Sequence, residues 1–236
     1  MLPLSRPLIT VLLVLAAGTA LAQDGLRAPS IYAPQTRAAW TGDAAIGLSL
    51  LTVPRDIAEE ELNKAPALDL NAVYGLPWNF SLTGRALVQV LTNSVHLGAR
   101  WSVDIGPFAA AVGDESAFCF GFMTVDGFDN SMQAWLNAPN IAIGLDAGDV
   151  RFTVKAELML VLALRTYAGE NQLGSTKNVS AGWALTGVIE QPFWKRTHVL
   201  LGARVALTQF HPQTWFAFST FNRRLLFSEL IFGVML

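Results

Sequence analysis

Hydrophobic and polar residues alternate along Val150–Arg165 with a period of two. Every even-numbered position in this segment is apolar, whereas the odd-numbered positions include Arg151, Lys155 and Glu157. Because successive side chains of a strand point to opposite faces, the pattern predicts a strand with one apolar and one charged face. Strands of soluble proteins usually have about five or six residues. A longer strand without a charge on its apolar face is typical of a sheet that crosses lipid.

The same alternation recurs before and after this segment and predicts about ten strands. We place them at Trp40–Leu50, Leu68–Leu76, Phe80–Val90, Val95–Ile105, Ala117–Val125, Ile141–Leu145, Val150–Arg165, Ala181–Ile189, Val199–Leu207 and Leu226–Leu236. The fifth and sixth are the least regular, so eight strands remain an alternative.

The predicted connections differ in length between the two ends of the strands. Those at one end are short, whereas the other end has three long ones at Thr52–Pro66, Tyr167–Lys177 and Gln209–Asn222. The connection at Thr92–Asn93 is an exception, because it is short where a long one is expected. Transmembrane barrels have short periplasmic turns and longer external loops. We therefore predict an all-β fold, an antiparallel up-and-down transmembrane β-barrel over residues 38–236.

The N-terminus has the organisation of an export signal. Arg6 precedes the apolar run Leu8–Ala17, and Ala20-Leu21-Ala22 forms a small-x-small cleavage site. These features predict a signal peptide over residues 1–22 that is cleaved after Ala22. Residues 23–37 are polar and contain prolines, which predicts an irregular periplasmic lead-in before the barrel.

The composition agrees with a membrane protein that crosses by strands. Hydrophobic residues make up 52% of the chain and charged residues 14%, whereas soluble domains carry about 25% charged residues. A soluble barrel with its apolar face inward would show the same alternation. The predicted polar face, however, is rich in Gly, Ser, Thr and Ala, which suits a narrow interior better than a water-facing exterior. The net charge of −2 and the absence of a basic patch argue against a nucleic-acid partner.

Tryptophans fall near the predicted ends of the strands. Indole rings prefer the headgroup level of a bilayer, where they form aromatic girdles. We assign Trp40, Trp78 and Trp194 to the periplasmic interface, and Trp135 and Trp215 to the outer one.

The signal peptide, the alternating strands and the ending Leu230–Leu236 together resemble the small bacterial outer-membrane β-barrel proteins, the loose group of OmpA-, OmpX- and OmpW-like barrels. The ending is similar to the terminal strand that the barrel-insertion machinery reads, although Leu236 stands where Phe or Trp is usual. The resemblance implies a Gram-negative outer membrane, with the lipid bilayer and that machinery as partners. It names no ligand, because many functions share this fold.

Sequence motifs for catalysis, cofactors or metals are absent. The three histidines lie at different predicted depths, so we expect no metal site, and we expect no cofactor. Ser94 and His96 share a face and resemble the nucleophile and base of some outer-membrane lipid hydrolases. A third group must orient such a base, and Asp104 lies about 26 Å along the same strand. We therefore expect no enzymatic activity, with a lipid-modifying enzyme as the residual alternative.

The predicted interior carries charges of both signs near mid-depth. The predicted lumen charge cluster contains Arg85, Arg100, Arg204, Glu157, Lys155, Asp104, Asp43 and Glu229. Ten strands enclose little space, so mutual pairing would give a salt-bridged interior and a structural or surface-interaction role. The alternative is a narrow, porin-like channel whose arginine-rich waist favours small anions.

Overall fold

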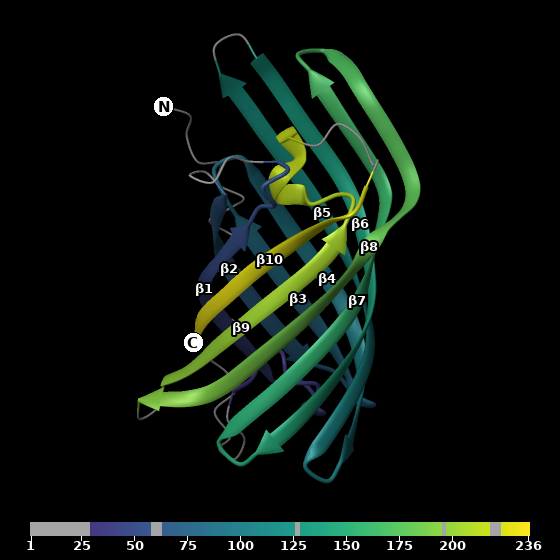
Figure 1. The fold of residues 1–236 in the computed structure, drawn as a ribbon. Coiled ribbons are helices and arrows are strands. Elements are labelled where there is room, and N and C mark those ends of the chain that lie inside the picture. The colour runs from purple at the N-terminus through teal and green to yellow at the C-terminus, as the bar shows by residue number, and fades with distance from the viewer. Residues whose placement is uncertain (1–28, 58–62, 126–127, 195–196, 218–222) are drawn as a thin grey trace.

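The computed structural model describes residues 29–57, 63–125, 128–194, 197–217 and 223–236, and these residues form a closed antiparallel β-barrel (Figure 1). The predicted signal peptide and its cleavage site lie outside the described residues. The strands are β1 (Gly42–Thr52), β2 (Lys64–Gly75), β3 (Phe80–Val88), β4 (Thr92–Ile105), β5 (Phe108–Val125), β6 (Phe128–Ala147), β7 (Val150–Ala168), β8 (Asn171–Trp194), β9 (Thr197–Thr208) and β10 (Leu225–Met235). Each strand pairs with its neighbours in sequence, and β1 pairs with β10 to close the barrel. The predicted ten-stranded up-and-down barrel is confirmed.

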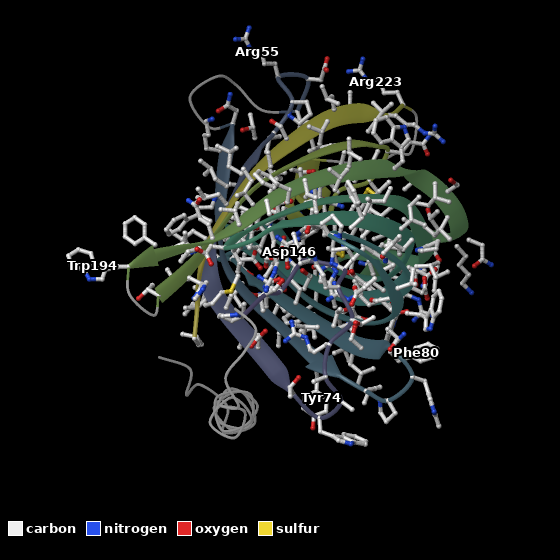
Figure 2. The ribbon with its side chains drawn as sticks, turned by 90° about the horizontal axis from the view of Figure 1, so that it is seen from below. Arg55, Tyr74, Phe80, Asp146, Trp194 and Arg223 are labelled. Carbon is white, nitrogen blue, oxygen red and sulfur yellow. The ribbon has the colours of Figure 1, made fainter. Side chains whose placement is uncertain are left out.

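The apolar face of the barrel points outward. Leu48, Leu97 and Leu230 are 59%, 68% and 61% exposed, whereas inward-facing Asp69 and Glu229 are 1% and 4% exposed. A soluble barrel with its apolar face inward would bury these leucines. The structure therefore excludes that arrangement of the two faces. Seen from below, side chains fill the lumen, and Tyr74, Phe80 and Trp194 lie on the outer side (Figure 2).

Strands β5 to β8 are longer than the others and rise above them at one end of the barrel (Figure 1). The predicted fifth and sixth strands were therefore too short. The predicted loop Tyr167–Lys177 is wrong, because β7 and β8 continue to a two-residue turn at Gly169 and Glu170. Gly169 has φ +56°, which such tight hairpin turns require. Above the apolar band both faces of a hairpin meet water, so hydrophobic alternation no longer marks the strand.

A bulge inverts the alternation near the end of β7. The β6–β7 register shifts between Trp135 and Leu136, so that Leu162 has no partner in the ladder. An extra residue in one strand moves all following side chains to the opposite face. Leu164, predicted on the outer face, is therefore buried in the interior, and Arg165, predicted inside, is exposed.

Among the described residues, no helix has the length and apolarity needed to cross a membrane.

Candidate functional site

A central ion-pair network crosses the interior at mid-height. Arg85 contacts Asp69 at 2.8 Å and Glu229 at 2.7 Å. Arg204 contacts Glu229 at 3.5 Å and also pairs with Glu157. The network continues through Lys155 and comprises Asp69, Arg85, Glu229, Arg204, Glu157, Lys155 and Glu115.

The network joins strands that are not neighbours in the sheet. Lys155 of β7 contacts Glu157 at 2.9 Å and reaches over β6 to Glu115 of β5 at 3.0 Å. Ser49 of β1 donates to Glu229 at 2.5 Å. The side chains in these ion pairs are at most 20% exposed. Removing one partner of such a buried pair leaves an uncompensated charge, so the network holds the barrel wall together across the lumen.

Residues 29–38 enter the barrel as an N-terminal plug at the end with the short turns. The described part of the predicted lead-in is irregular, and it lies inside the lumen. The carboxylate of Glu190 accepts hydrogen bonds from the backbone N–H groups of Ile31 (2.6 Å), Tyr32 (3.0 Å) and Ala33 (3.1 Å). It also accepts one from the hydroxyl of Ser30 at 2.6 Å. A single buried carboxylate thus binds three consecutive backbone N–H groups of the plug.

Three residues of the predicted lumen charge cluster bind this plug instead of joining the network. Arg100 donates to the carbonyls of Tyr32 and Ala33 at 3.2 and 2.9 Å. Asp43 pairs with Arg37, and Asp104 accepts a hydrogen bond from the backbone N–H of Thr36 at 2.9 Å. The other five predicted residues, Arg85, Arg204, Glu157, Lys155 and Glu229, lie in the central network.

Asp69, Glu115 and Glu190 belong to the site but not to that predicted cluster. Glu115 lies in the half of β5 that showed no clear alternation. Glu190 lies on β8, and its partners in the plug are more than 150 residues away in the sequence. No local pattern marks such contacts.

The segment Phe210–Trp215 forms an outer plug at the opposite end. It leads into the 3-10 helix η3 (Pro212–Ala217), which sits in the upper part of the barrel (Figure 1). Phe210 and Trp215 pack with inward apolar residues of β5 to β8, namely Ala117, Cys119, Met132, Ala134, Val161, Leu164 and Ala181. Trp215 is 5% exposed, so its assignment to the outer aromatic girdle is wrong. Its hydrophobic surface fills the barrel rather than facing lipid.

His211 of the outer plug is held in its neutral form. Its ring stacks on Phe227 with centroids 4.8 Å apart, and its Nδ1 accepts a hydrogen bond from the backbone N–H of Gln213 at 3.4 Å. Loss of solvation by burial lowers the pKa of His211 to about 3. Burial also raises the pKa of Tyr32 in the N-terminal plug, which keeps its hydroxyl protonated.

The two plugs border a chamber of about 130 Å³. Ile31 and Tyr32 line it on one side, and Phe210 and His211 on the other. Its wall is mixed: residues of the central network alternate with small and apolar residues such as Ala99, Ala138 and Val161.

Ser94 and His96 also line this chamber. His96 Nε2 lies 3.1 Å from the Ser94 hydroxyl. Glu115 on the neighbouring strand is engaged by Lys155, and Asp104 contacts the N-terminal plug. Among the described residues, the carboxylates of Glu115 and Asp104 are thus engaged elsewhere and do not orient His96 as a base.

Four predicted girdle tryptophans are exposed on the barrel surface. Trp40, Trp78 and Trp194 lie at the end with short turns and are 65%, 85% and 67% exposed. Trp135 lies on the outer face of β6, where its ring is 5.2 Å from that of Phe118. Within the described residues, no group of three metal-ligating side chains is present.

No protein-family model matches the chain, and no curated protein sequence matches it. Among solved structures, the crystal structure of Neisserial surface protein A is similar over 83% of this chain and 94% of that one, at 11% identity and a TM-score of 0.39. The translocator domain of the autotransporter NalP from Neisseria meningitidis is similar over 97% of this chain and 94% of that one, at 10% identity and a TM-score of 0.39.

Proposed function

We propose that the chain is a bacterial outer-membrane β-barrel protein with a closed interior and a structural or surface-interaction role. Its outward-facing leucines, valines and aromatic residues suit a hydrocarbon environment. The signal peptide expected at the N-terminus would direct its export, and the C-terminal strand would guide its insertion.

The closed interior is supported by one observation: groups of the chain fill the lumen at three levels. The N-terminal plug is bound through Glu190 and Arg100. The central network pairs its charges across the lumen, and the outer plug packs Phe210 and Trp215 against the wall. A solute would have to displace buried, hydrogen-bonded groups at each level, which is costly.

The part of the barrel beyond the apolar band supports a role at the cell surface. Strands β5 to β8 extend past their neighbours (Figure 1), and polar residues of the β7–β8 hairpin such as Glu170, Gln172 and Lys177 are exposed. A rigid, polar hairpin of this kind offers a surface for a partner without requiring the lumen.

Planar-bilayer recording of the purified full chain tests the proposal. We expect no steady conductance at neutral pH. A variant that loses the bonds of the N-terminal plug, Glu190→Ala, serves as the comparison, because partial unplugging should add transient openings. Steady, anion-selective steps in the unmodified protein, abolished by Arg100→Ala, would overturn the closed interior in favour of the narrow channel.

The lipid-modifying alternative has its own test. Ser94 and His96 are in contact inside the chamber, so hydrolysis of envelope lipid that is lost in His96→Ala would favour it. We expect equal, background-level turnover in both proteins.

A further inference from the structure

The ladder between β6 and β7 is interrupted at mid-height. Pairing runs from Asn130 to Asn137 and resumes at Asn140, and it skips Ala138 and Pro139. Proline has no backbone N–H to donate. The carbonyl of Ala138 accepts instead from the side chain of Asn140 at 2.9 Å. We call this interruption the β6–β7 seam.

The chamber reaches the wall of the barrel at the seam. Leu136, Ala138 and Asn140 line the chamber from β6, and Glu157, Met159 and Val161 line it from β7. Asn137 and Leu160, which face each other across the ladder beside the seam, also line it. Because β7 additionally shifts register against β8 between Met159 and Leu160, this part of the wall lacks the regular bonding that stiffens a sheet.

The outer side of the seam carries polar groups on an otherwise apolar face. Asp114 of β5 is exposed and pairs in register with Pro139. Asn137 Nδ2 donates to both carboxylate oxygens of Asp114, at 2.9 and 2.8 Å. Asp114 lies six residues from the lower end of β5, about 14 Å along the barrel axis for a strand tilted by about 45°. That height falls near the middle of an apolar band about 25 Å tall, where a carboxylate is disfavoured unless it has a polar partner.

We propose that the chamber binds the aliphatic chain of an uncharged, hydroxyl-bearing lipid, which enters from the bilayer through the β6–β7 seam. The proposal rests on the membrane location given under the proposed function. The chain lies inside the chamber, and its hydroxyl head donates to Asp114 at the outer rim.

The chemistry of the chamber selects this class of ligand. The charged groups of the central network pair with one another, so a charged ligand would be buried without compensation. The carboxylate at the rim accepts hydrogen bonds and repels an anionic head. The chamber of about 130 Å³ is close to a cavity of about 150 Å³ that takes up benzene in another protein. It therefore holds the end of one chain and not a whole diacyl lipid.

Photolabelling in lipid vesicles tests the site. The full chain is reconstituted in phosphatidylcholine with a monoacylglycerol that carries a diazirine near the chain end. We expect labelled peptides to include Leu136 and Val161, which face the chamber. Labelling confined to outward residues such as Leu158 and Ile141 would overturn the proposal.

A reversible staple tests the route. Ala138→Cys with Met159→Cys, made in a Cys119→Ala background, places two thiols on opposite sides of the seam, between the flanking pairs Asn137–Leu160 and Asn140–Glu157. After oxidation we expect chamber labelling to fall at least tenfold, and reduction of the same protein should restore it. The matched control, Ala86→Cys with Val95→Cys in the same background, staples β3 to β4 on the outer face and should leave labelling unchanged. Unchanged labelling with the seam stapled would show that the ligand arrives from water along the axis, and would overturn the lateral route.

The head group provides a second readout. We expect the monoacylglycerol to label the chamber at least threefold more than the corresponding fatty acid, and Asp114→Asn to remove this difference. Equal labelling by both probes in the unmodified protein would contradict the role of Asp114. Conductance of the unmodified protein would refute the closed interior, but it would not change the photolabelling of the stapled protein. The two experiments therefore distinguish a failure of the proposed function from a failure of lateral lipid entry.

Discussion

The two plugs fill opposite ends of one barrel by different chemistry. The N-terminal plug is held by hydrogen bonds: Glu190 accepts from the backbone N–H groups of Ile31, Tyr32 and Ala33, and Arg100 donates to the carbonyls of Tyr32 and Ala33. The outer plug is held by apolar contact, with Phe210 and Trp215 in a cluster of buried alanine, valine, leucine and methionine side chains. The chain thus closes one end with directional bonds and the other with close packing.

The difference follows from what each segment brings into the lumen. An irregular segment without secondary structure buries unpaired backbone groups, which must find partners. The outer plug satisfies part of its backbone within its own turn, where Thr214 N–H donates to the His211 carbonyl at 3.1 Å. Its stability therefore depends on the fit of large side chains, whereas that of the N-terminal plug depends on a few charged groups.

The largest effect is expected from Trp215→Ala. Truncating a buried tryptophan leaves a cavity and costs about 3–5 kcal/mol, which chemical unfolding from vesicles would measure. Cys119, buried in the same cluster, should become reactive to thiol reagents, while the N-terminal plug stays protected from hydrogen exchange. Trp135→Ala on the outer face is the control, and an equal loss in both variants would contradict the apolar account of the outer plug.

Glu190→Ala should release the N-terminal plug. Four donors lose their common acceptor, and we expect a loss of about 3 kcal/mol since bonds to charged groups contribute about 1.5–3 kcal/mol each and are not additive. Hydrogen exchange at residues 30–33 should rise while Cys119 stays unreactive. Glu170→Ala in the exposed β7–β8 turn is the matched control. Unchanged exchange at the plug would show that Arg100, Asp43 and Asp104 retain it without Glu190.

Acid should loosen the outer plug. The pKa of His211 is about 3 in the folded protein and about 6.5 in an unfolded chain, so between these values the unfolded state binds more protons and stability falls as the pH falls. Arg204 and Arg85 lower this pKa further, whereas Glu229 opposes them. The loss attributable to His211 is about 1.6 kcal/mol between pH 6.5 and 5, because the slope approaches about 1.4 kcal/mol per unit only once the unfolded imidazole is mostly protonated. His211→Phe should remove this part of the pH dependence and His198→Gln should not; identical acid profiles for all three proteins would refute the assignment.

The smallest effects are expected from two glycines that make room for the plugs. A Cβ at Gly121 would lie 2.3 Å from Trp215 Nε1, and one at Gly144 would lie 2.5 Å from Pro34 Cδ. Overpacking of this kind costs about 1–3 kcal/mol. We expect Gly121→Ala to raise Cys119 reactivity and Gly144→Ala to raise exchange in the N-terminal plug, each without the other effect. Loosening of both plugs by either variant would show that they are coupled through the chamber.

The sequence alone predicted the barrel and its outward apolar face, because a period of two is set locally by the strand backbone. It also predicted that Arg85, Arg204 and Glu157 face inward. It did not predict the length of β5 to β8, because strands with both faces in water carry no hydrophobic alternation. The inversion at Leu164 was missed for a related reason: a bulge depends on the partner strand and leaves the composition unchanged.

What the tertiary structure decided is how the lumen is filled. Glu190 meets Ile31 across 159 residues of sequence, Trp215 turns inward onto β5 and β6 instead of outward to lipid, and Pro139 interrupts a ladder that the alternation alone would leave intact. Each of these depends on which distant residues the closed sheet brings together. The alternation along the chain thus determined the wall of the barrel, and long-range contacts determined what lies within it.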